Sequence, residues 1–144
     1  MNMPLTQELR DQREAIVREH MEAENRLDFA GALATFARPR YELIGTGQVY
    51  DGPEEVTEYF RRSRTPFPDQ HNEIIAMHHA DDAVITEFWL MGTHLGRFLG
   101  VEATGRTFRV QMAAFFLFED AGLVNERVYF NPKQIADQLF AADV

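Results

Sequence analysis

The chain of 144 residues contains no cysteine, only one serine (Ser63) and only one lysine (Lys133). Without cysteine it can form no disulfide, thiolate nucleophile or thiolate metal site. Ser63 lies in the polar run 61–64 (Arg-Arg-Ser-Arg), which provides neither the base nor the oxyanion hole that a serine nucleophile needs. Lys133 follows Pro132 where a helix is expected to begin, which argues against a buried Schiff-base lysine. An enzyme of this composition would therefore use acid–base or electrostatic catalysis.

Basic residues are also scarce. The 14 Lys and Arg residues face 23 Asp and Glu residues, which gives a net charge of −9. This balance argues against nucleic acid and against an anionic membrane surface as partners. The first residues show no signal-peptide pattern, and no apolar run approaches the length of a membrane span. We expect a cytoplasmic protein with one domain over residues 1–144.

The first part of the chain has the spacing of helices. Apolar residues recur every three or four positions from Leu5 to about Asn25, which predicts an amphipathic helix with Thr6 as its cap. A second helix is expected with Asp28 as its N-cap, and it should end before Pro39. After a short strand and turn near 40–50, the run 51–55 (Asp-Gly-Pro-Glu-Glu) opens a third helix.

The second part of the chain is rich in strands. Four runs are predicted as strands, at about 73–79, 83–94, 107–118 and 123–130, and a short final helix is expected at 132–140. Short turns between these runs favour an antiparallel meander. Helices followed by consecutive strands indicate an α+β fold. Residues 112–118 are apolar at every position, so both faces of the sheet need a cover, and a second copy of the chain is the expected cover for the face without helices.

Several short motifs follow one another in a characteristic order. They lie at 25–28 (Asn-Arg-Leu-Asp), 52–56 (Gly-Pro-Glu-Glu-Val), 92–100 with 104–105, 119–130 and 138–139 (Gln-Leu). Together they resemble the SnoaL-like polyketide cyclase family of the nuclear-transport-factor-2-like superfamily, from about Leu9 to Leu139.

The resemblance implies a cone-shaped α+β barrel, in which N-terminal helices pack on a strongly curved antiparallel sheet around a deep pocket, with a short C-terminal helix. It implies a homodimer through the convex sheet face. It also implies a cofactor-free enzyme of the polyketide cyclase, isomerase or hydratase type, which acts by acid–base chemistry on a small apolar carbonyl substrate. The family's catalytic aspartate position matches Asn131, and asparagine cannot act as a general base near neutral pH. The alternatives are a non-catalytic ligand-binding domain of the same fold and a purely structural dimerisation module.

Three residues are candidates for catalysis. His94, at the end of a predicted strand, is expected to face the interior as a general acid or base, or to hydrogen-bond the glycine-rich turn around it. His20 lies on the apolar stripe of the first helix, either as a pocket base or as a satisfied core histidine. Asn131 either polarises a substrate oxygen or caps the last helix.

The expected substrate-binding residues fall into two groups. Gln111, Tyr129 and Arg127 are the expected hydrogen-bonding groups, with an interface residue, a core aromatic and a structural ion pair as their respective alternatives. The expected apolar lining is Phe88, Leu90 and Phe115. The sequence shows no spacing typical of a metal site, so neither a metal nor another cofactor is expected.

Overall fold

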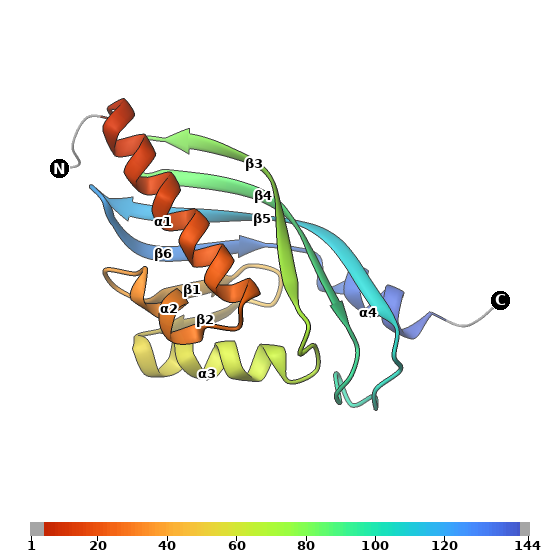
Figure 1. Ribbon diagram of the computed structural model, residues 1–144. Coiled ribbons are helices and arrows are strands. Elements are labelled where there is room, and N and C mark those ends of the chain that lie inside the picture. Colours follow the sequence, from red (N-terminus) through yellow and green to blue (C-terminus); the bar gives the residue numbers. More distant parts are fainter. Residues whose placement is uncertain (1–4, 142–144) are drawn as a thin grey trace.

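The computed structural model describes residues 5–141. The elements in chain order are α1 (Gln7–Asn25), α2 (Phe29–Ala34), β1 (Arg40–Leu43), β2 (Gln48–Asp51), α3 (Pro53–Arg64), β3 (His71–Ala80), β4 (Ala83–Thr93), β5 (Thr107–Glu119), β6 (Gly122–Tyr129) and α4 (Pro132–Phe140). The predicted α+β fold is confirmed, with helices packed on one curved sheet (Figure 1). Within residues 5–141, no helix is both long enough and apolar enough to cross a membrane.

The six strands form one sheet in the order β2-β1-β6-β5-β4-β3. Strands β3 to β6 make the predicted antiparallel meander. The β1–β6 pair is parallel, with Tyr41 opposite Glu126 and Leu43 opposite Val128. This pairing joins residues far apart in the sequence, which short-range patterns do not reveal.

Burial alternates along β5 and thereby identifies the inner face of the sheet. Its even-numbered residues, from Phe108 to Phe118, are buried, while the odd-numbered residues are half-buried or exposed. Helix α1 lies across this inner face (Figure 1). Register shifts at Ile74/Ala76 and at Leu117/Phe118 mark bulges, which increase the local twist and bending of strands.

The helix ends follow the capping chemistry of their sequences. Thr6 Oγ1 accepts the Leu9 N–H at 3.1 Å, and the Asp28 carboxylate accepts the Gly31 N–H at 2.9 Å, so both predicted caps are confirmed. At the other end of the chain, Gln138 on α4 exchanges two hydrogen bonds, of 2.7 and 3.1 Å, with the backbone of Arg109. The pairing of β5 with β6 stops at Ala113. Beyond that residue, the Gln138 side chain makes backbone hydrogen bonds to β5 of the kind that a neighbouring strand would make.

Candidate functional site

A pocket of about 750 Å³ opens between α3, the β1–β2 hairpin, the inner face of the sheet and the first turn of α4. Its apolar wall includes Leu43, Met112, Val128 and Ile135. This is a volume typical of small-molecule sites, which are mostly apolar with a few polar groups. The polar lining comes chiefly from α3 and the β1–β2 hairpin, and includes Tyr59.

The ionisable lining of the pocket is limited to two tyrosines and two arginines: Tyr50, Tyr59, Arg62 and Arg97. No aspartate, glutamate, histidine or lysine of the described residues lines it. Burial raises the pKa of Tyr59 well above its usual range, so its hydroxyl stays protonated and can donate. An imidazole or carboxylate that acts on a molecule in the pocket would therefore have to come from the layer behind the lining.

His94 lies in that second layer. It is fully buried, and its ring contacts Phe67 and Phe98, which line the pocket, and Phe140. The Thr104 N–H donates to Nδ1 at 3.2 Å, so Nδ1 is an acceptor and the proton of the neutral ring is on Nε2. Nε2 has no hydrogen-bond partner within residues 5–141. His94 is thus interior, as expected, but its side chain bonds Thr104 and not the glycine-rich turn.

His20 lies at the centre of a buried ion network. Its Nε2 is 2.9 Å from Glu126 Oε1, 3.1 Å from Glu24 Oε1 and 2.6 Å from the Tyr41 hydroxyl. Its Nδ1 lies 2.8 Å from Thr35 Oγ1 and 3.2 Å from the Ala32 carbonyl oxygen, an obligate acceptor. Because both ring nitrogens face acceptors, the geometry fits a doubly protonated ring, and the alternative of a satisfied core histidine is confirmed.

This network brings two basic side chains, His20 and Arg64, together with two carboxyl groups, those of Glu24 and Glu126. Burial alone would lower the pKa of His20, but the carboxylates of Glu24 and Glu126 raise it to about 10. Burial opposes ionisation of Glu24 as well, yet His20 and Arg64 hold its pKa at about 2, and Arg64 Nη2 lies 2.7 Å from Glu24 Oε2. Burial raises the pKa of Glu126 above its usual range. At neutral pH His20 is a cation and not a free base.

The same network contains a possible metal-ligand set. One ligand atom each from His20, Glu24 and Glu126 lies within 4.8 Å of the others. However, Nε2 already contacts both carboxylates directly, and His20 and Arg64 supply the charge that two acids require. The counter-charges of the two carboxyl groups therefore already lie within the network, although Glu126 Oε1 makes no hydrogen bond of good geometry among residues 5–141.

The predicted substrate-binding residues are divided between the two faces of the sheet. Leu90 lines the pocket, and Phe88 is buried on the same inner face, opposite Met112. Gln111, Phe115, Arg127 and Tyr129 lie on the outer face and do not line the pocket. Each is adjacent in sequence to an inward residue, so the strand parity inferred from the sequence was reversed for β5 and β6.

The outer-face residues have structural partners. Arg127 Nη2 lies 3.3 Å from Glu42 Oε1, which confirms the alternative of an ion pair. The rings of Phe115 and Tyr129 are 5.4 Å apart. Gln111 is exposed.

Asn131 is the N-cap of α4, as its alternative predicted. Its Oδ1 accepts the Lys133 N–H at 3.0 Å. Its neighbours Phe130 and Pro132 line the pocket, whereas Asn131 is exposed and does not.

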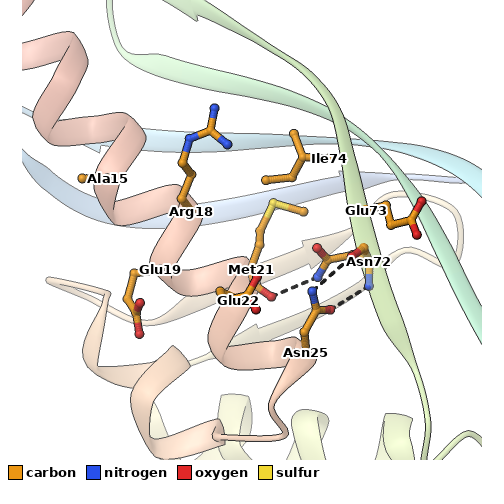
Figure 2. Close-up of a pocket in the computed structure, with 9 residues that line it drawn as sticks. All are labelled: Ala15, Arg18, Glu19, Met21, Glu22, Asn25, Asn72, Glu73 and Ile74. Atoms are coloured by element: carbon orange, nitrogen blue, oxygen red, sulfur yellow. Dashed lines mark hydrogen bonds between the residues drawn. The ribbon is translucent and has the colours of Figure 1, made fainter.

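A separate hollow lies between α1 and β3 (Figure 2). Asn25 and Asn72 face each other there, and the Asn72 N–H donates to Asn25 Oδ1 at 2.7 Å while Asn25 Nδ2 donates to the Asn72 carbonyl at 3.1 Å. Asn72 Nδ2 also donates to the Met21 carbonyl. These bonds fasten the edge strand β3 to α1, so the first residue of the motif at 25–28 has a structural role.

Comparisons with known proteins agree with this architecture. A family model described as SnoaL-like polyketide cyclase matches residues 14–139. No curated protein matches the chain.

Three solved structures illustrate the likeness of fold. A putative polyketide cyclase from Xanthomonas campestris pv. campestris has a TM-score of 0.80 and 22% identity, over 91% of this chain and 98% of that one. AclR, a putative hydroxylase from Streptomyces galilaeus, has a TM-score of 0.78 and 21% identity, over 93% and 85%. TsrD from Streptomyces laurentii has a TM-score of 0.76 and 22% identity, over 96% and 99%.

Proposed function

We propose that this chain, which belongs to the SnoaL-like polyketide cyclase family, binds a small and largely apolar carbonyl compound in its pocket and moves protons on it without a cofactor. The observation that carries the proposal is the ring of His94. It is a buried imidazole directly behind the pocket wall, with Nδ1 held by Thr104 and Nε2 unpartnered within the described residues.

A buried polar nitrogen without a partner costs free energy, so its persistence at a pocket wall favours a functional reason. In the neutral ring, Nε2–H donates a hydrogen bond to the substrate carbonyl oxygen and stabilises the enolate that forms when a water molecule takes an α-proton. The enolate carbon then takes a proton back from the solvent. Contact with the substrate requires the ring of Phe67 or Phe98 to turn aside. Tyr59 is the second polar group in this proposal, because its protonated hydroxyl can stabilise negative charge that develops on the carbonyl oxygen.

Proton exchange on a simple ketone tests the proposal without knowledge of the natural substrate. We expect the protein to accelerate exchange of the α-protons of 2-tetralone with D2O, followed by NMR, and His94→Leu, which removes the N–H donor, to abolish most of the acceleration. His78→Leu is the matched control, since His78 is exposed on the outer face and paired with Glu87. Equal exchange rates in wild type and His94→Leu would exclude His94 as the group that promotes exchange.

A second candidate function is binding without turnover. It is favoured by the capping role of Asn131 and by a pocket lining that has no carboxylate or imidazole in the described part of the chain. This candidate predicts that a small molecule co-purifies in native mass spectrometry while 2-tetralone exchange stays at the uncatalysed rate.

A further inference from the structure

We infer that the natural ligand of the pocket is an anion, with a carboxylate or a similar acidic group held by Arg62 at the mouth and an apolar body inside. The inference rests on the proposed function, because it concerns the same pocket. It adds the charge class of the ligand.

The first reason is the charge of the lining. The chain carries 23 acidic residues against 14 basic ones, yet the charged residues of the lining are two arginines, Arg62 and Arg97. No acidic residue of the described chain lines the pocket. A cavity that is lined by charges of one sign and has low-dielectric walls concentrates ligands of the opposite charge.

The second reason is the state of Arg62. Its guanidinium has no carboxylate within ion-pair distance in residues 5–141, and its contacts are with Tyr50: the ring centroid lies 5.7 Å away and the hydroxyl 3.5 Å from Nη2. The Tyr50 ring stacks in turn on Tyr59, with centroids 4.8 Å apart. This stack orients the guanidinium and leaves most of its donors free for a bidentate acceptor.

Of the two arginines, Arg97 is the weaker candidate for binding an anionic ligand. Its Nη1 lies 2.5 Å from Glu102 Oε1, so its charge is already compensated. Arg62 and Tyr50 also line a second surface hollow, together with Glu54, Glu55 and Glu58. Glu58 is paired with Arg61, and Glu55 accepts the Asp51 N–H, so neither is bound to Arg62.

A matched pair of dyes tests the inference. 8-Anilinonaphthalene-1-sulfonate and N-phenyl-1-naphthylamine share one aromatic body, and only the first carries an acidic group. We expect the sulfonate to bind at least fivefold more tightly, with an affinity that falls as salt rises. Arg62→Gln should weaken binding of the sulfonate by about fivefold to tenfold, as expected for loss of one partly exposed charged contact. It should leave the affinity for the neutral dye unchanged.

Two further variants complete the design. Arg61→Gln removes a neighbouring arginine that does not line the pocket, and it should change the affinity for neither dye. Leu90 is a half-buried residue of the pocket wall, and Leu90→Trp places a larger side chain in the pocket. This variant should weaken binding of both dyes equally. Near-ultraviolet circular dichroism verifies that each variant keeps its tertiary packing.

The outcomes separate the two proposals. Equal affinity for both dyes, with Arg62→Gln without effect and Leu90→Trp weakening both, would overturn the anion inference and leave the pocket as the binding site. Failure of both dyes to bind, or binding insensitive to Leu90→Trp, would count against the pocket itself and against both proposals.

Discussion

The Nε2 of His20 on α1 lies 2.9 Å from Oε1 of Glu126 on β6, and this contact ties the first helix to the last strand through the middle of the core. The imidazole is surrounded by the rings of Phe36, Phe60 and Phe116. Electrostatic contacts in such apolar surroundings are stronger than in water, and loss of one partner is correspondingly costly. The network is therefore the feature whose stability consequences are easiest to measure.

Replacement of Glu24 by glutamine should strongly destabilise the fold. Glu24 is the anion that His20 and Arg64 share, and its removal leaves two buried cations with only Glu126 near them. Loss of one member of a buried ion pair costs about 3–5 kcal/mol, which urea unfolding would register as a lower midpoint. Glu19→Gln, on the same helix but paired with Arg26 at the surface, is the control and should change little. Similar midpoints for the two variants would mean that the network is not energetically important.

The stability of the wild type should depend on pH at both ends of the scale. The pKa of His20 is raised from 6.5 to about 10, so its contribution is complete below pH 6.5 and is lost as the pH rises towards about 10. The pKa of Glu24 is lowered from 4.5 to about 2, so its contribution is complete above pH 4.5 and is lost as the pH falls towards about 2. Urea unfolding across this range should place the greatest stability between pH 4.5 and 6.5, with a shallow fall across that window because Glu126, whose pKa is raised, loses its contribution as it ionises. In Glu24→Gln both slopes should be shallower, and unchanged slopes would contradict the assignment.

Local patterns in the sequence predicted the helices, the meander and the caps, because each depends on residues close together in the chain. Thr6, Asp28 and Asn131 act through N–H groups two or three residues away. The parallel pairing of Tyr41 with Glu126 depends on residues more than eighty positions apart, and no local pattern encodes it.

The candidate site was harder to predict, because a strand alternates and one misjudged position reverses every side chain on it. Tyr129 was predicted to bind substrate, whereas its neighbours Val128 and Phe130 are the residues that line the pocket. Tyr59 and Arg62 were not among the predicted site residues, although both line the pocket about one helical turn apart on α3.

Substitutions at Asn131 separate its capping role from a chemical one. Aspartate and asparagine cap helices equally well, so Asn131→Asp should keep the stability of the wild type, whereas Asn131→Ala should lose about 1 kcal/mol in urea unfolding. Because the Asn131 side chain is exposed and bound to the Lys133 N–H, we also expect Asn131→Asp to leave 2-tetralone exchange unchanged. Exchange gained only in Asn131→Asp would instead indicate an enzyme fold now used for binding.

The outer face of the sheet should mediate a homodimer. Phe115 is half-buried there and packs against Tyr129, and Ile85 and Leu117 are apolar neighbours on the same face. A contiguous apolar surface of this kind favours association with a second copy. Sedimentation velocity should therefore give the mass of a dimer for the wild type and of a monomer for Phe115→Glu. Leu27→Glu makes the same charge change at an exposed apolar residue between α1 and α2, and should remain dimeric. A monomeric wild type, or a dimeric Phe115→Glu, would show that this face is not the interface.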